Sequence, residues 1–228
     1  MKKKILVIAA HPDDEVLGCG GALSKFSKLG YEVNVAFFSD GVSSRDLKLG
    51  KKKKEILQRK KSSYRAAKIL GINKIEFFDL PDNQFDTIPL LKIVKLVESL
   101  IKKYSPSTIF THYDNDLNID HRMISRAVVT TTRPYPGSCV KRLLFFEIPS
   151  STEWNFSSSL KSFSPNYFIN IDNELRIKLK AIKCYPQELR KWPHPRSLEG
   201  INNLAKTRGA TCGFKSAESF ILVREIFS

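Results

Sequence analysis

The feature that most constrains the fold of this chain is an uninterrupted apolar run at residues 5–10, directly followed by His11-Pro12-Asp13-Asp14-Glu15. A continuous apolar run of this length is typical of a strand buried on both faces, as in a parallel sheet covered by helices. An imidazole and three carboxylates within five residues are costly to bury, but they can bind a metal and move a proton. The pattern therefore predicts a buried first strand whose end carries chemically active side chains.

Strand-like and helix-like patterns alternate along the rest of the chain. Strands are expected at residues 4–10, 31–38, 74–78, 108–111, 141–147, 166–171 and 220–226. Helices are expected at residues 16–29, 46–70, 88–104, 120–131, 173–185 and 198–206, with Asp172 as the cap of the fifth. This alternation predicts an α/β fold with a mainly parallel sheet flanked by helices, in which ligands lie at the carboxyl ends of the strands. No linker or repeat interrupts it, so residues 1–228 are expected to form a single domain.

A second acidic cluster, residues 114–122, follows the strand expected at residues 108–111 and contains His121. Zinc takes histidine nitrogen and carboxylate oxygen, and a catalytic site uses three protein ligands. We therefore expect His11, Asp14 and His121 to hold one metal, which leaves Asp13 free to act as a general base. The alternative is that the acidic residues only cap a helix and that His121 is bonded to Asp120.

Composition restricts the class of protein further. The net charge of +15 includes several lysine runs, and a lysine-rich surface is favoured over a nucleic-acid binder because no nucleic-acid motif is present. The four cysteines form no Cys-x-x-Cys pair, so free thiols in the cytoplasm are expected. No apolar run approaches the roughly 20 residues that would span a membrane.

Several short motifs together resemble the PIG-L/LmbE family of zinc-dependent N-deacetylases. The most specific is His11-Pro12-Asp13-Asp14-Glu15, and Asp120-His121-Arg122 is the second. Other matching stretches follow in the family's order: Gly18-Cys19-Gly20-Gly21, Ser39-Asp40-Gly41, Arg59 with Ala66, Leu70 and Gly71, Leu80-Pro81-Asp82, His194-Pro195-Arg196-Ser197, Arg208-Gly209 and Ala217-Glu218-Ser219-Phe220. Ser62 departs from the pattern, since the family's helix motif has Glu there.

The resemblance implies a partly Rossmann-like fold and the same metal ligands and base, and it places Arg59 and Asp82 among the substrate-binding residues. Asn118 stands where several members have a second histidine. Asparagine can donate a hydrogen bond to an oxyanion but cannot be a general acid. The acid role therefore stays open between Asp13 itself, His112 and His194.

Two further groups are expected near the pocket. Arg122, Arg133 and Arg196 are candidates to hold a phosphate or carboxylate, with helix-surface positions as the alternative. Trp192, beside His194, either stacks on a sugar ring or packs against the protein. His112, which follows a strand, is counted with the substrate-binding residues.

The resemblance implies a metal-dependent hydrolase that removes acetyl from an N-acetylated amino sugar, nucleotide- or carrier-linked, in glycan biosynthesis. Zn²⁺ is the expected cofactor and Fe²⁺ the alternative; the expected partner is a small amino sugar, not a specific nucleic acid, and a homo-oligomer stays open. The competing functions are an amidase on another N-acyl or thiol-conjugate substrate, and a non-catalytic glycan- or nucleotide-binding module.

Overall fold

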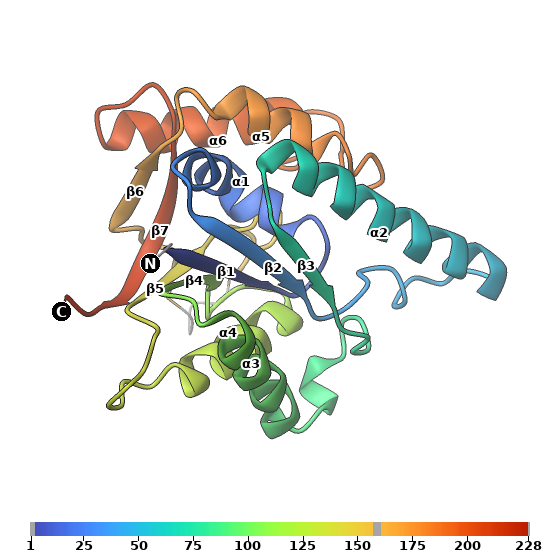
Figure 1. The fold of residues 1–228 in the computed structure, drawn as a ribbon. Coiled ribbons are helices and arrows are strands. Elements are labelled where there is room, and N and C mark those ends of the chain that lie inside the picture. The colour runs from blue at the N-terminus through green and yellow to red at the C-terminus, as the bar shows by residue number, and fades with distance from the viewer. Residues whose placement is uncertain (1–2, 157–160, 228) are drawn as a thin grey trace.

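A central sheet of seven strands, in the order β3-β2-β1-β4-β5-β7-β6, organises the protein in the computed structural model, which describes residues 3–156 and 161–227 (Figure 1). The strands are β1 (Lys4–Ala9), β2 (Glu32–Phe37), β3 (Lys74–Phe77), β4 (Thr108–His112), β5 (Arg142–Phe146), β6 (Tyr167–Asn170) and β7 (Ala217–Glu225). The helices are α1 (Asp14–Lys28), α2 (Leu49–Leu70), α3 (Leu90–Tyr104), α4 (Ile119–Thr131), α5 (Leu175–Ile182) and α6 (Leu198–Thr211), with a 3₁₀ turn η1 (Phe85–Thr87).

The order of the strands determines where a ligand can bind. Strands β1 to β5 pair in parallel, whereas β7 runs antiparallel between β5 and β6. The chain builds outward from β1 through β2 to β3 and then returns to the other side of β1 to form β4. The loops after β1 and β4 therefore diverge at a switch point, where open α/β sheets bind ligands. The predicted α/β fold with a mainly parallel sheet is confirmed.

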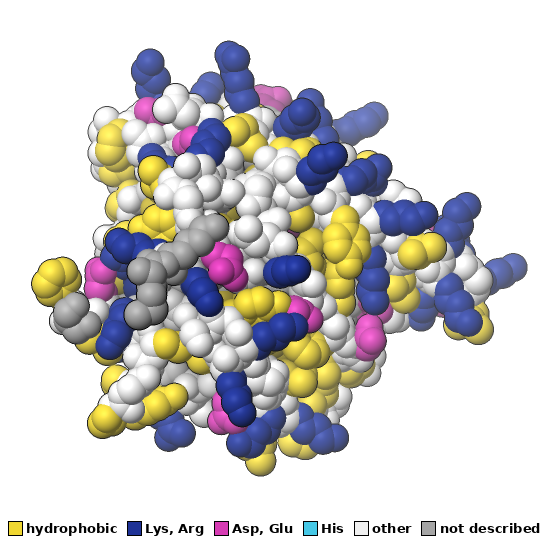
Figure 2. All heavy atoms as spheres, in the orientation of Figure 1, with side chains coloured by type: hydrophobic (Ala, Val, Ile, Leu, Met, Phe, Trp, Pro, Cys, Tyr) yellow, Lys and Arg dark blue, Asp and Glu magenta, His cyan; other side chains and the backbone are white. Residues whose placement is uncertain are grey.

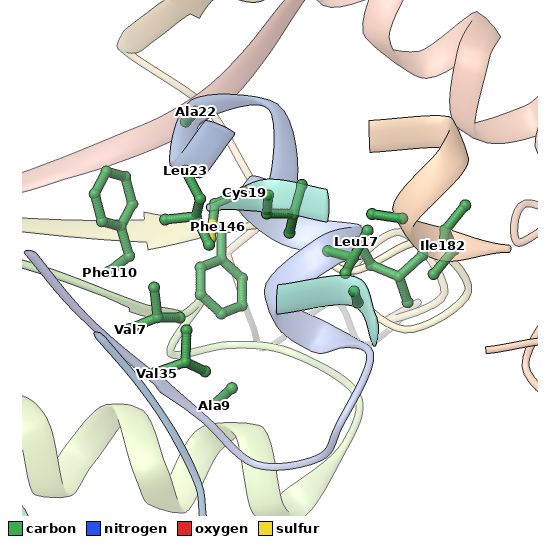
Figure 3. Close-up of a cluster of buried hydrophobic side chains, with 14 of the residues drawn as sticks. Val7, Ala9, Leu17, Cys19, Ala22, Leu23, Val35, Phe110, Phe146 and Ile182 are labelled. Carbon is green, nitrogen blue, oxygen red and sulfur yellow. The ribbon is translucent and has the colours of Figure 1, made fainter. Parts of the chain in front are cut away.

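Helices cover both faces of the sheet. Helices α1, α2, α5 and α6 lie on one face, and α3 and α4 on the other (Figure 1). Successive residues of β1 point to opposite faces, so Val7 and Ala9 join the core under α1 while Leu6 and Ile8 join the core under α3 and α4. Figure 3 shows the first of these cores. Burial on both faces explains why the first strand is uniformly apolar.

The expected elements all occur, with ends that differ by at most five residues. One local prediction is wrong: Asp172 does not cap α5, which begins at Leu175 after Glu174. The carboxylate of Asp172 instead accepts a hydrogen bond from the backbone N–H of Ser216 at 2.6 Å, because the loop before β7 folds against it. Within the described residues, the helices are all too short or too polar to cross a bilayer.

Candidate metal and catalytic site

The turn between β1 and α1 brings His11, Asp13 and Asp14 to the carboxyl end of the sheet. Asp13 has φ 128°, a strained backbone conformation of the kind found at functional sites. Its N–H donates to Oε2 of Glu15 at 3.0 Å, and the hydroxyl of Tyr185 donates to the other oxygen of Glu15 at 2.6 Å. Glu15 is buried, and burial raises its pKa to about 8. Its carboxyl group therefore supports the turn from inside the protein.

Three side-chain atoms on this edge form a candidate metal site. Nδ1 of His11 and Nε2 of His121 each lie 3.5 Å from Oδ2 of Asp14, and one atom from each residue lies within 4.8 Å of the others. Tetrahedral zinc with bonds of about 2.1 Å separates its ligand atoms by about 3.4 Å. The buried Nε2 of His121 also has no hydrogen-bond partner, which is costly unless something else occupies it. The residues present therefore fit a zinc ion.

Both histidines are held from behind by a carboxylate, as metal-binding histidines usually are. Nδ1 of His121 lies 3.0 Å from Oδ1 of Asp116, and Nε2 of His11 lies 3.1 Å from Oδ2 of Asp120. Asp120 accepts backbone N–H groups of Asn83 and Phe85, which keep it in place. The alternative in which His121 bonds to Asp120 is wrong, because Asp120 instead contacts His11 and the backbone of Asn83 and Phe85.

The charges of this cluster favour the binding of a metal ion. Burial disfavours the charged form of Asp14, but the charge of the neighbouring His121 and a hydrogen bond from His11 outweigh it and hold its pKa well below the usual range. Burial alone would lower the pKa of His121, but Asp14 and Asp116 raise it to about 9. The raised pKa of His121 reflects the negative charge of Asp14 and Asp116 beside it, which a divalent cation would neutralise.

Asp13 is paired with two arginines. Its two oxygens lie 3.2 Å from Nη2 of Arg59 and 3.2 Å from Nη1 of Arg196. Glu188 pairs with both of these arginines and, at 2.7 Å, with Arg45. Burial raises the pKa of Asp13 to about 6, although both arginines oppose the shift. A carboxylate with this pKa accepts a proton more readily than an ordinary aspartate.

A polar cavity of about 160 Å³ joins the metal triad to Asp13. It is lined by His11, Asp13, Asp14, Gly41, Ser44, Arg45, Arg59, Asp82, Asn83, Asn118, His121, Glu188 and Arg196. Eight of the residues expected at the site therefore line one cavity, whereas His112, Arg122, Arg133, Trp192 and His194 are not in this lining.

Asp82 and Asn118 both line this cavity. Oδ1 of Asp82 lies 3.1 Å from Nε2 of His11, and Ser44 donates to its other oxygen at 2.6 Å. Asn118 caps α4 by accepting the N–H of Asp120 at 2.8 Å, and its amide donates to Asn83 at 3.1 Å. One N–H of Asn118 has no role in these bonds and can serve a ligand.

The remaining predicted residues lie elsewhere. His112 is fully buried behind the site, where Nε2 accepts the N–H of Ala10 and the ring stacks on His121 at 3.8 Å. Burial holds its pKa well below the usual range, so it is neutral. Arg122 donates to the carbonyl oxygen of Asp116 and so stabilises its own loop. Neither residue lines this cavity, so their contact with substrate stays a prediction.

Three further expectations concern residues at the rim or beyond it. Nδ1 of His194 accepts the N–H of Arg196 at 3.0 Å, and its ring packs edge-on against Trp154. Trp192 is 55% exposed, so it neither packs in the core nor lines the cavity. Arg133 follows the far end of α4 and lines a separate surface groove, because α4 carries the chain away from the site.

Several functional candidates were not predicted from the sequence. Arg45 and Glu188 complete the charge network around Asp13, and Ser44 and Asn83 line the cavity. Asp116 belongs to the second acidic cluster, which is evident from the sequence. Its role in holding His121 was not predicted. Glu188 stands in no pattern; it lies in the segment after α5, and α5 packs against α2, the helix that carries Arg59.

Comparison with known proteins identifies the family of this chain. A family model described as PIG-L: GlcNAc-PI de-N-acetylase matches residues 6–132, more than half of the chain. The matched segment includes the triad and Asp13. The chain therefore belongs to the PIG-L family.

Individual relatives include deacetylases of sugars. The uncharacterised deacetylase YaiS of Escherichia coli (strain K12) is 29% identical over 80% of this chain and 90% of its own length. Diacetylchitobiose deacetylase of Thermococcus kodakarensis is 25% identical over 99% of this chain and 85% of its own. The solved N,N'-diacetylchitobiose deacetylase from Pyrococcus horikoshii shares the fold, with a TM-score of 0.78, 22% identity, and coverage of 97% of this chain and 84% of its own.

One relative carries a different activity. The 4-oxalmesaconate hydratase of Pseudomonas putida is 25% identical over 85% of this chain and 77% of its own length. A hydratase and a deacetylase both add water to a substrate, so membership of the family leaves the reaction to be argued from the site.

Proposed function

We propose that this protein is a zinc-dependent N-deacetylase that removes acetyl from an N-acetylated amino sugar. The observation that carries the proposal is the ligand triad of His11, Asp14 and His121 beside Asp13, a carboxylate that belongs to the same turn and does not ligate. The triad would hold a metal that acts as a Lewis acid, and Asp13 would act as a base in the same cavity. The free thiols of the four cysteines favour a cytoplasmic location.

The chain's own residues support each proton transfer. A divalent metal, when bound, acidifies water and polarises the amide carbonyl. Asp13 takes a proton from the attacking water, and Arg59 and Arg196 hold its carboxylate in place. Asp13 then carries the proton that the leaving amine needs, because its pKa is raised to about 6, whereas the pKa values of the lining carboxylates Asp82 and Glu188 lie below their usual ranges. Asn118 has an amide N–H available for a substrate oxygen.

The cavity favours a neutral, hydroxyl-rich group. Its lining is almost entirely polar, and its three arginines already face Asp13 and Glu188. A phosphate would have to displace these carboxylates before it could bind the arginines. We therefore place the sugar ring inside the cavity and any nucleotide or lipid carrier outside it.

The test is a screen for acetate release by zinc-loaded protein. The substrates are N-acetylglucosamine, diacetylchitobiose, N-acetylglucosamine 1-phosphate and the nucleotide-linked form. Asp13→Asn is the matched control, because it should keep zinc and lose roughly 10²–10⁴ in rate. Acetate release that depends on Asp13 supports the proposal. Hydration of an unsaturated acid without acetate release from any sugar would assign the chain to the hydratase side of the family.

A further inference from the structure

The positive charge of the protein is concentrated on one helix. Helix α2 contains seven lysines, two arginines and one glutamate, which gives it a net charge of +8 out of +15 for the whole chain. Figure 2 shows Lys and Arg side chains crowded over α2 at the right of the view, with hydrophobic side chains between them. Only Arg59 of these cations is buried in the cavity described above.

The lysines at the start of α2 destabilise the helix locally. The first turn of α2 has no acidic residue, and Lys51 to Lys54 follow directly. The positive end of the helix dipole repels cations there. Four adjacent lysines also repel one another. A local rule broken in this way is expected where a surface has a binding role.

One stripe of α2 combines charge with exposed apolar side chains. Lys53, Leu57, Lys61, Tyr64 and Lys68 recur at intervals of three or four residues, so they lie on one face of the helix. Leu57 is 55% exposed and Tyr64 is 59% exposed. We refer to these five residues together with Lys54 as the α2 stripe.

The lysines of the α2 stripe are free to meet a partner. In the described part of the chain, the only ion pairs on α2 outside Arg59 are those of Glu55 with Arg45 and of Lys60 with Asp79. No carboxylate there lies within ion-pair distance of Lys53, Lys54, Lys61 or Lys68. Tyr64 touches the ring of Phe77 at its edge but remains mostly in solvent.

We propose that the α2 stripe docks on the surface of a phospholipid bilayer that contains anionic headgroups. Lysines near such a surface gain from its negative potential, while leucine and tyrosine side chains enter the headgroup region. The exposed Leu57 and Tyr64 distinguish this partner from a nucleic acid, whose backbone is bound through phosphate contacts.

The stripe is connected to the cavity through the start of α2. Helix α2 runs antiparallel to the strands it joins, so its beginning lies at the carboxyl end of the sheet. Ser44 and Arg45 of the cavity lie in the segment just before it, and Lys52 donates to the carbonyl oxygen of Ser43 at 2.8 Å. Docking would bring the cavity to a sugar carried on a membrane lipid, and this consequence rests on the proposed function. The docking itself does not depend on the proposed function.

The experiment measures binding of the full chain to vesicles in the absence of substrate. Its result does not depend on whether the protein is a deacetylase. Vesicles of phosphatidylcholine are compared with vesicles that also contain phosphatidylglycerol, at physiological ionic strength. The test variant is Lys53→Gln/Lys54→Gln/Lys61→Gln. The control, Lys92→Gln/Lys102→Gln/Lys180→Gln, removes the same charge from exposed positions on α3 and α5.

We expect binding only to the anionic vesicles, a loss of roughly 100-fold in the test variant, and less than about threefold in the control. Leu57→Gln should also weaken binding, whereas Leu91→Gln, at an exposed leucine of α3, should not. Equal losses in both triple variants would show an effect of net charge alone and overturn the proposal. Unchanged binding by Leu57→Gln, or tighter binding to duplex RNA than to vesicles, would also overturn it.

Discussion

Nδ1 of His121 lies 3.0 Å from Oδ1 of Asp116, while Nε2 of the same ring faces Asp14 at 3.5 Å without a hydrogen bond. The carboxylate of Asp116 therefore fixes both the orientation of the ring and the nitrogen that is presented to a metal. Asp116 is itself fixed, since Thr152 donates to it at 2.6 Å and Ser151 donates to its other oxygen.

Asp116→Asn should lower zinc affinity by about 10- to 100-fold, because the amide supports the ring less well. A zinc titration against a competing chelator measures this. Asp114→Asn, two residues away at an exposed position, is the control and should leave the affinity unchanged. An equal affinity in Asp116→Asn and wild type would show that Asp116 does not position the ligand.

Arg59→Lys should lower the rate of deacetylation by about 10- to 100-fold. Three different nitrogens of Arg59 contact Pro12, Asp13 and Glu188, and a single ammonium group cannot span these positions. Loss of these hydrogen bonds should also lower the free energy of unfolding by about 1–3 kcal/mol. Steady-state kinetics and denaturant unfolding check both values.

The matched control for this change is Arg65→Lys on the same helix. Arg65 is exposed and donates a hydrogen bond to Ser62, so this substitution should change the free energy of unfolding by less than about 0.5 kcal/mol. Similar losses in the two variants would contradict a special role for Arg59.

Gly18→Ala should destabilise the fold by about 1–3 kcal/mol, because a Cβ there would lie 2.4 Å from Cδ2 of Phe146 in the core. Gly50→Ala is the control: nothing lies within 4 Å of its Cβ, and removing a glycine from an exposed helix gains up to about 1 kcal/mol. Urea unfolding of both variants compares them. A Gly18→Ala protein as stable as Gly50→Ala would show that α1 can move away from β5.

The sequence predicted those parts of the fold that depend on local patterns. The apolar run at residues 5–10 fixed β1, and the residue types at its end predicted His11, Asp13 and Asp14 as neighbours in one site. Asp172 was misassigned because its partner, Ser216, lies 44 residues away and no periodicity connects them.

Prediction of the site failed for residues whose position depends on the length of a helix or on contacts between segments far apart in the sequence. Arg133 was expected near the pocket, but the 13 residues of α4 extend for about 20 Å and carry it away. Arg45 and Glu188 form an ion pair across 143 residues, which the charge pattern of neither segment indicates.

The metal content of the purified protein tests the central claim most directly, since that claim is that His11, Asp14 and His121 together hold one divalent ion. Elemental analysis should find about one zinc per chain in the wild type and almost none in His121→Ala, with circular dichroism showing that the variant is folded. Full zinc occupancy in a folded His121→Ala protein would contradict the account.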